Sequence, residues 1–318
     1  MNCSHVPCRV LRKPSVRGAL IVSGVVAMAL AFTARAEFPE RTIRMVVPYT
    51  PGGPASLLGR FVGQKLQQAT GQPVIIENKP GAGLAVGAQF VANSPADGYT
   101  LFLGASSMLV PGSAGGRTPA DNLRDLRAVS LVGGFPLILV TGSQFDAKTV
   151  PELIALARQR PGQVNYGSSG NGSLTHLAAA LFALQAGVDM VHVPFRGINE
   201  AATDLAAGRV QLAFVGAPTV PPLVAGGRIR ALAVTSLQRS AAAPQLPSIA
   251  EAALPGYEVI PWYGIMVPTA TPPAIVTRLH REIVRIMQSG EAREQWKEWG
   301  ADPTFSKSPE EFTALMQK

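Results

Sequence analysis

The sequence predicts an α/β protein in which largely parallel strands alternate with helices. Short runs of β-branched and apolar residues recur along the chain, and each ends in glycine, proline or serine. Between these runs lie longer segments whose apolar residues recur with helical spacing. This alternation is typical of parallel sheets covered by helices. With 318 residues, 47% of them hydrophobic, the chain can form a large core and two lobes.

The first expected strand, 43–47, leads into a proline- and glycine-rich loop and then a helix. Gly52 and Gly53 help to stop the strand, and Pro54 suits the first position of a helix, where its missing N–H would be unpaired anyway. A helix that begins behind two glycines presents backbone N–H groups and partial positive charge, which together can bind an anion. A tight turn without any ligand is the alternative interpretation.

The same arrangement recurs at 164–184, where a short strand, a Gly/Ser/Asn loop and a helix follow one another. Ser169 or Asn171 is expected to cap this second helix. One such loop is common, but two suggest a pair of helix N-termini that face each other. We therefore hypothesise two amide-rich loops that bind one anionic ligand between them.

The remaining elements follow in order. Further strands are expected at 73–77, 99–103, 126–132, 137–141, 190–193, 210–215 and 229–235, and a long strand or crossing segment at 257–267. Further helices are expected at 82–92, from a capping box at Thr149 to about Arg160, from an Asn199 cap to Gly208, at 272–288, at 291–298, and after a Ser308 cap. Trp262 and Tyr263, on the crossing segment, are interpreted either as walls of a pocket or as core aromatics.

The first 36 residues have the organisation of a secretory signal. Basic residues precede an apolar run from Ala19 to Phe32, and Ala34-Arg35-Ala36 follows, so cleavage is expected after Ala36. An uncleaved anchor is the alternative, although the run is shorter than the ~20 residues that span a bilayer. The segment holds five basic and no acidic residues, so its removal lowers the net charge from +8 to +3. The positive charge therefore does not indicate nucleic-acid binding.

Both cysteines, Cys3 and Cys8, also lie in this segment, so no disulfide or thiolate metal site is expected after cleavage. The three histidines that remain, His176, His192 and His280, have neither i, i+4 spacing nor a carboxylate at ligand spacing. No nucleophile-elbow or P-loop motif occurs, and the glycines near Gly81 miss the dinucleotide fingerprint by one residue. We therefore expect no enzyme, no metal and no cofactor.

Two polar residues have two interpretations each. His176 stands near the start of the second helix, where it either contacts a ligand or has a local capping or packing role. Arg196 follows a strand beside Phe195 and Gly197, where it either pairs with a ligand carboxylate or lies on the surface. His280, between two arginines of a helix, is expected on a solvated face.

Eight segments, in the right order, resemble the substrate-binding proteins of tripartite tricarboxylate transporters, the Bug-type family. They are FPERTIRMVVPYTPGG, GQPVIIENKPGAG, DGYTLFLG, NYGSSGNGSLTHLAA, VHVPFRG, AGRVQLAF, GRIRALAVTS and PWYGIMVP. The resemblance implies a type II periplasmic binding-protein fold, in which two α/β lobes are joined by crossing strands and hold the ligand between them. It implies a first lobe made of 37–136 and 259–318, a second lobe made of 137–258, and a signal peptide at 1–36.

By position, the resemblance also implies ligand contacts in both lobes. Those of the first lobe are Tyr49, Thr50, Pro51, Gly52, Gly53, Ser106 and Ser107. Those of the second lobe are Ser168, Ser169, Gly170, Asn171, Gly172, Ser173, His176, Phe195, Arg196, Gly197, Ala217, Pro218 and Thr219. Family ligands are small carboxylates or related molecules, held largely by backbone amides, small hydroxyls and bound waters.

The chain departs from the family pattern at two positions. Ser56 stands where members often have an acid, and no Asp-Asn pair occurs near Gly216 and Ala217. Because an ammonium group would need such a carboxylate, these departures favour a carboxylate ligand without an amine.

The expected function is that of a periplasmic solute-binding protein that closes over a small carboxylate and delivers it to transporter subunits in the membrane. A ligand-sensing receptor that delivers its closed form to a membrane sensor kinase is the alternative. The protein is expected to act as a monomer and to bind no nucleic acid.

Overall fold

The computed structural model describes residues 38–109, 121, 124–240, 243–299, 301 and 303–317. The expected signal peptide, its cleavage site after Ala36 and both cysteines lie outside these residues. The chain divides into two units, of which the first ends at Glu40 and the second begins at Arg41, and the elements named below all belong to the second. Among the described residues, no helix is both long enough and apolar enough to cross a membrane.

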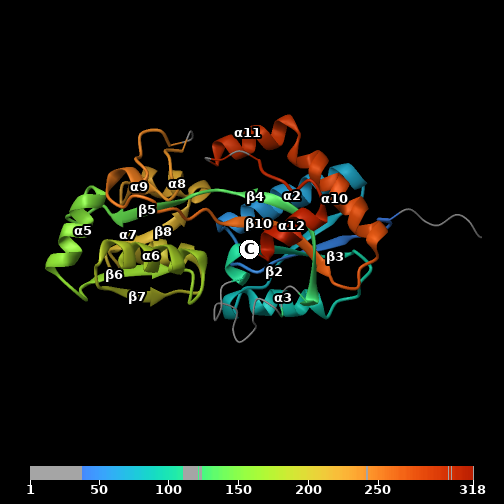
Figure 1. The fold of residues 1–318 in the computed structure, drawn as a ribbon, viewed down its shortest axis with the longest axis horizontal. Helices are drawn as coiled ribbons and strands as arrows, with labels where there is room; N and C mark the ends of the chain where they lie inside the picture. The colour runs from blue at the N-terminus through green and yellow to red at the C-terminus, as the bar shows by residue number, and fades with distance from the viewer. Residues whose placement is uncertain are drawn as a thin grey trace, which may run out of the picture. The chain divides into compact units, whose positions relative to one another are not determined.

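The described strands form two five-stranded sheets, and the first has the order β2-β1-β3-β10-β4. Its strands are β1 (Ile43–Val47), β2 (Val74–Asn78), β3 (Thr100–Ala105), β4 (Leu126–Gly134) and β10 (Trp262–Pro268). Strand β1 runs parallel to β2 and β3, whereas β10 runs antiparallel to β3 and β4. The helices packed around this sheet are α2 (Pro54–Thr70), α3 (Ala85–Ala92), α10 (Pro273–Met287), α11 (Gly290–Glu298) and α12 (Pro309–Met316) (Figure 1).

The second sheet has the order β7-β6-β8-β5-β9. Its strands are β5 (Leu137–Gly142), β6 (Val164–Ser168), β7 (Met190–Pro194), β8 (Leu212–Gly216) and β9 (Ile229–Val234). Strand β6 runs parallel to β7 and β8, whereas β5 runs antiparallel to β8 and β9. Its helices are α5 (Val150–Gln159), α6 (Leu174–Ala186), α7 (Ile198–Ala206), α8 (Val220–Ala225) and α9 (Ile249–Ala252).

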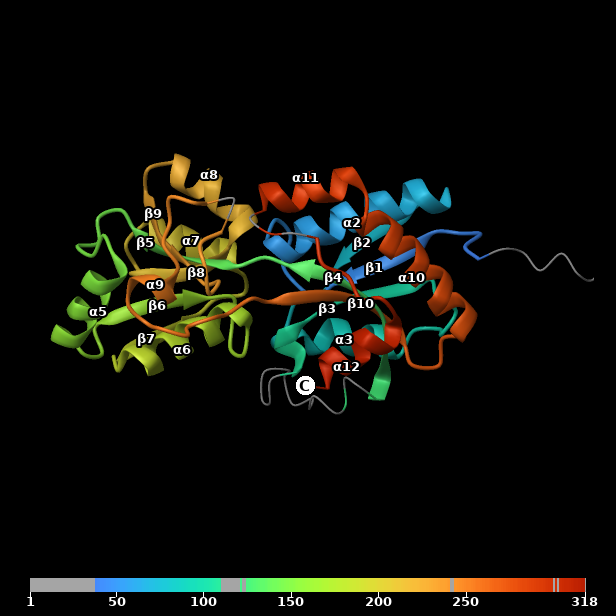
Figure 2. The ribbon, with the colours of Figure 1, turned by 45° about the horizontal axis from the view of Figure 1, so that its top comes forward.

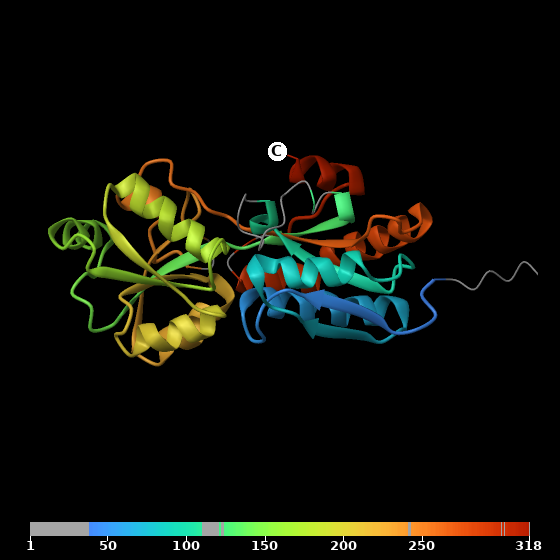
Figure 3. The same ribbon diagram turned by 90° about the horizontal axis from the view of Figure 1, so that it is seen from below.

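Helices α6 and α7 cover opposite faces of the second sheet (Figure 3). Phe182 of α6 packs with Phe214 and Tyr257 in one apolar core, while Leu205 of α7 packs in another with Val215. Because neighbouring residues of a strand point to opposite faces, Phe214 and Val215 of β8 reach different cores. The sheet is therefore buried on both sides, as the apolar strand segments of the sequence predict.

Two segments connect the sheets: the short link from β4 to β5, and the longer one from β9 to β10 (Figure 2). They pass so closely that a Cβ atom at Gly134 would lie 1.8 Å from the carbonyl oxygen of Pro261. No real Cβ contact is that short, so the crossing requires glycine at this position.

Most expected elements are found within a few residues of their expected bounds, but several details differ. Helix α6 is capped by Ser173, whose Oγ accepts the His176 N–H at 3.3 Å, and not by Ser169 or Asn171. Helix α7 begins after Gly197 without a side-chain cap, so the expected Asn199 cap is wrong. The connection after β9 contains a short helix, α9, which begins in a capping box formed by Ser248 and Glu251.

Two expectations near the end of the chain also need correction. Strand β10 begins at Trp262, because Tyr257 is held in the core of the second sheet, where its hydroxyl donates to the Ala178 carbonyl at 2.9 Å. His280 does not face solvent freely. Its Nδ1 lies 3.0 Å from the Val129 carbonyl oxygen and its Nε2 lies 3.2 Å from that of Lys307, so its ring links β4 to the segment before α12.

Candidate functional site

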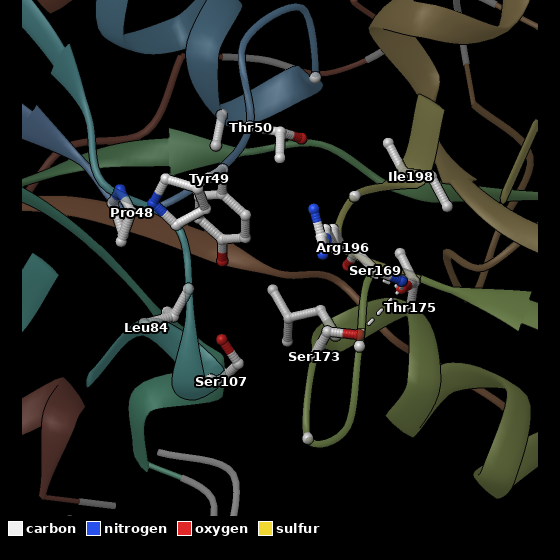
Figure 4. A pocket seen from close by; sticks show the side chains of 18 of the residues that line it. Pro48, Tyr49, Thr50, Leu84, Ser107, Ser169, Ser173, Thr175, Arg196 and Ile198 are labelled. Atoms are coloured by element: carbon white, nitrogen blue, oxygen red, sulfur yellow. Dashed lines mark hydrogen bonds between the residues drawn. The ribbon is translucent and has the colours of Figure 1, made fainter. Parts of the chain in front are cut away.

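A cavity of about 580 Å³ lies where loops of the two sheets meet (Figure 4). Its walls come from the loops after β1, β2, β3, β6 and β7, from the first residues of α2, α6 and α7, and from the ends of β5, β8 and β10. The volume falls within the ~300–1,000 Å³ of small-molecule sites.

Twelve of the twenty expected contact residues line this cavity. They are Tyr49, Thr50, Gly53, Ser107, Ser169, Gly170, Asn171, Gly172, Ser173, Phe195, Arg196 and Gly197. The other eight are not among the lining residues: Pro51, Gly52, Ser106, Ser168, His176, Ala217, Pro218 and Thr219. The cavity brings the two glycine-containing loops together, while ligand contact at any of these residues stays a prediction.

The loop after β1 brings the N-terminus of α2 to the cavity. Helix α2 has no side-chain cap, and the N–H groups of Ser56 and Leu57 both donate to the Gly53 carbonyl, at 3.0 and 3.1 Å. Asn78 at the end of β2 holds the loop, because its Nδ2 donates to the Tyr49 carbonyl at 2.8 Å and also lies 3.5 Å from the Ser56 Oγ. Ser56 is fully buried. Ser56, one of the two departures noted in the sequence, therefore has a structural role behind the cavity.

The loop after β6 is held by hydrogen bonds to its own side chains. Ser168 Oγ accepts the Gly170 N–H at 3.1 Å and lies 3.3 Å from the Gly170 carbonyl oxygen. The Gly172 N–H donates to His176 Nδ1 at 3.1 Å, and the Ser169 N–H donates to Thr175 Oγ1 at 2.9 Å. The Ser173 N–H donates to the Gly170 carbonyl. Four of the amides expected to bind a ligand are thus already engaged within the loop.

Three hydroxyls of this loop form a cluster at the cavity wall. Thr175 Oγ1 lies 3.0 Å from both Ser169 Oγ and Ser173 Oγ, and all three residues line the cavity (Figure 4). A hydroxyl has one proton to donate and two lone pairs. Thr175 can donate to one serine and accept from the other, so the serine that accepts keeps its own O–H for a ligand. We call these three residues the hydroxyl cluster.

Two stacked imidazoles lie behind the loop. The rings of His176 and His192 are 4.0 Å apart between centroids, and Tyr166 stacks on His192 at 4.9 Å. Burial, together with the nearby charge of His176, lowers the pKa of His192 to about 4, and burial also lowers the pKa of His176. His176 must be unprotonated at Nδ1 to accept the Gly172 N–H, and Ser168 Oγ lies 2.6 Å from His192 Nε2.

These histidines do not form a metal site. In the part of the chain that the structure describes, no group of three or more His, Cys, Asp or Glu side chains could hold a metal ion. Of the two interpretations of His176, local packing and capping of the loop agrees with its contacts, because the residue does not line the cavity.

The N-termini of α2 and α7 approach each other at one edge of the cavity. A Cβ at Gly197, the residue before α7, would lie 2.2 Å from Thr50 Oγ1, and one at Gly216 would lie 2.4 Å from Pro54 Cγ. Asn199 Nδ2 also donates to the Pro51 carbonyl at 3.3 Å. Both helices lack a side-chain cap, but the Glu200 carboxylate lies in the first turn of α7, so the partially positive helix end without a nearby acid is that of α2.

Among the described residues that line the cavity, Arg196 is the one charged residue. Its backbone N–H donates to Glu200 Oε2 at 3.3 Å, while no carboxylate pairs with its guanidinium within the described residues. The described part of the lining contains no acidic side chain. The site is thus suited to a ligand of negative charge.

Sequence reasoning missed a third glycine-containing loop of the cavity, between β2 and α3. Residues 80–84 line the cavity, and two of them have left-handed backbones that non-glycine residues rarely adopt: Ala82 at φ 46° and Leu84 at φ 78°. Strain of this kind is concentrated at binding sites. The available signal was the pair Gly81 and Gly83, which resembles a nucleotide motif but equally marks a loop at a strand end.

Tyr263 also lines the cavity, whereas Trp262 packs edge-on against Phe312 with ring centroids 5.3 Å apart. The Tyr263 ring lies 6.5 Å from that of Tyr49. Burial raises the pKa of Tyr49 to about 12, partly offset by the Ser107 hydroxyl, and raises that of Tyr263 well above its usual value. The other lining residues that were not expected are Pro48, Pro54, Ala55, Leu137, Leu174, Thr175, Ile198 and Gly216.

Comparison with known proteins places this geometry in context. A family model described as tripartite tricarboxylate transporter family receptor matches residues 58–317. Protein BugT of Bordetella pertussis is 36% identical over 289 residues, which cover 90% of this chain and 87% of BugT.

Several solved structures are also similar. R. palustris Rpa4515 with adipate has a TM-score of 0.83 and 35% identity, covering 88% of this chain and 94% of that one. MatC (Rpa3494) from Rhodopseudomonas palustris with bound malate has a TM-score of 0.79 and 27% identity, covering 88% and 96%. Periplasmic binding protein BugD has a TM-score of 0.80 and 26% identity, covering 88% and 94%. The expected fold class, two α/β lobes of the type II periplasmic binding-protein kind, is confirmed.

Proposed function

The chain belongs to the tripartite tricarboxylate transporter receptor family, and from this membership we propose that it captures a small carboxylate in the cavity for uptake by a membrane transporter. Members of this family are substrate-binding receptors and not enzymes. Two relatives, Rpa4515 and MatC, have structures with adipate and malate. Both molecules are carboxylates, which supports the ligand class proposed here.

The observation that carries the proposal is the charge of the cavity wall. No acidic residue among the described lining residues opposes Arg196, and the uncapped end of α2 adds partial positive charge. An amino acid would leave its ammonium group without a counter-charge. We therefore propose a carboxylate that lacks an amine.

We also propose that the lobes are 37–136 with 259–318, and 137–258, and that they rotate about the crossing at Gly134 and Pro261. The β4–β5 and β9–β10 connections are the covalent links between the two sheets, so rotation of one sheet against the other has to be absorbed there. Closure would bring the twenty expected contact residues toward the ligand and would change the surface offered to a membrane partner. The signal-like first 36 residues and the periplasmic relative BugD support export and cleavage after Ala36.

The test uses the chain from residue 37 onward, purified from a periplasmic extract. Calorimetric titration with a panel of carboxylates, their amides and amino acids should show binding of at least one carboxylate and of no amino acid. X-ray scattering on the same samples should show compaction with the bound carboxylate. If only uncharged compounds or amino acids bind, the proposal is wrong.

A further inference from the structure

We propose that the ligand is an amphiphilic monocarboxylate, with one carboxylate and an apolar or aromatic body, and not a compact di- or tricarboxylate. This inference rests on the proposed function and names the ligand class of the same cavity. Its basis is the uneven distribution of charge, hydroxyls and apolar surface over the cavity wall.

One side of the cavity can satisfy one carboxylate. Arg196, Ser169, Ser173 and Thr175 all come from the second sheet and lie on the same side in Figure 4. A guanidinium can bind both oxygens of one carboxylate, and the hydroxyl cluster can add an O–H donor. The N-terminus of α2 belongs to this side too, because Thr50 lies against Gly197. We call this side the anion pole.

Among the residues that the structure describes, the opposite side offers a second carboxylate no counter-charge. It is formed by Pro48, Tyr49, Leu84, Ser107 and Tyr263 with the loop 80–83, and none of these residues is basic. Tyr263 is only 5% exposed, and burial raises the pKa of both tyrosines. A carboxylate there would lose water without gaining a cation, and such burial is strongly unfavourable.

The same side suits an apolar body. The rings of Tyr49 and Tyr263 meet edge to face, and Phe135 packs behind Tyr263 with centroids 5.3 Å apart. Leu84 is only 7% exposed and is held against this wall by its left-handed backbone. Flat rings and a branched side chain give an aromatic or aliphatic group contact over a large area.

The first experiment is a calorimetric titration of the exported chain with benzoate, 3-phenylpropionate, malate, adipate and citrate, with benzamide as the uncharged analogue of benzoate. We expect an aromatic monocarboxylate to bind at least about tenfold more tightly than malate, adipate and citrate, and benzamide to bind more weakly than benzoate. If one of the three polycarboxylates binds as tightly or more tightly, the inference is overturned while the proposed function stands. If none of the five carboxylates binds, the inference is overturned as well, and the wider carboxylate panel then decides the proposed function separately.

The second experiment tests the charged side and the apolar side of the cavity independently, with one substitution in each. Arg196→Gln should lower affinity for the aromatic monocarboxylate about tenfold or more, with Arg160→Gln, an exposed arginine of the same lobe, as the matched control. Leu84→Asn makes the apolar wall polar, and asparagine tolerates the left-handed backbone at this position. It should weaken binding of 3-phenylpropionate more than binding of acetate. Equal effects on both acids, or an unchanged affinity in Arg196→Gln, would contradict the proposed orientation.

Discussion

Replacing Gly197 with alanine tests whether the close approach of two loops is needed for binding. The residue has φ −165°, an extended backbone that alanine adopts readily, so the substitution introduces no strain within its own loop. The new Cβ would instead lie 2.2 Å from Thr50 Oγ1 and 3.1 Å from the Thr50 Cβ and Cγ2 atoms. The clash therefore exists only when the loop after β1 lies against the start of α7.

The expected magnitude follows from that overlap. Overpacking of this size typically costs ~1–3 kcal/mol. In the proposed rotation the two loops move apart, so the cost falls on their close contact and not on the folding of either sheet. An equilibrium that is shifted by ~1–3 kcal/mol corresponds to a dissociation constant about 5- to 150-fold higher.

The assay is calorimetric titration with a carboxylate that binds the unaltered chain, beside urea unfolding to show that stability is retained. Thr50→Ala removes the Oγ1 atom, so the double variant should recover part of the lost affinity relative to Thr50→Ala alone. Gly226→Ala is the matched control, because its nearest neighbour would be the Leu223 carbonyl oxygen at 3.6 Å. An unchanged dissociation constant in Gly197→Ala would show that binding does not require this contact, and the reasoning would then fail.

Three further predictions concern stability. Ser173→Ala should lower the free energy of unfolding by about 1 kcal/mol, because α6 loses its cap; urea unfolding measures this, and the unrelated cap variant Ser289→Ala should show a similar loss. The free energy of unfolding should be highest above pH 6.5 and should fall as the pH approaches 4, because the pKa of His192 is lowered in the folded protein and its protonation therefore favours the unfolded chain. Urea unfolding at neutral and acidic pH should show a smaller decrease of this free energy in His192→Gln than in the unaltered chain. An identical decrease would exclude this cause. Gly134→Ala should destabilise the protein by ~1–3 kcal/mol or more, because its Cβ would meet the Pro261 carbonyl at 1.8 Å; a melting temperature equal to that of the unaltered chain would contradict the tight crossing.

Local signals in the sequence predicted much of the fold. Strand β1 and the start of α2 at Pro54 lie where expected, and Thr149 caps α5 by accepting the Glu152 N–H. These features depend on residues close in sequence: a proline without an N–H, an apolar run, or a hydroxyl three residues before a donor. The strand–loop–helix repeat likewise predicted that the loops of Gly52 and Gly170 would face one ligand; Gly170 lines the cavity and Gly52 does not, and ligand contact stays a prediction.

The remaining parts of the site depend on contacts that no local pattern contains. Tyr263 reaches the cavity because β10 lies between β3 and β4 in the sheet, although β10 is far from both strands in sequence. Leu84 lines the cavity because its backbone adopts a left-handed conformation that its residue type disfavours. Ser168 turns away from the cavity because His192, on the neighbouring strand β7, lies 2.6 Å from its hydroxyl.

The internally bonded loop after β6 has a consequence for how the specificity of this chain can change. Its N–H groups at Ser169, Gly170, Gly172 and Ser173 maintain the loop's own shape. Ligand recognition is then left to the hydroxyl and amide side chains that project from this backbone frame. Point substitutions among serine, threonine and asparagine could therefore redirect such a receptor toward a new nutrient while its architecture stays intact.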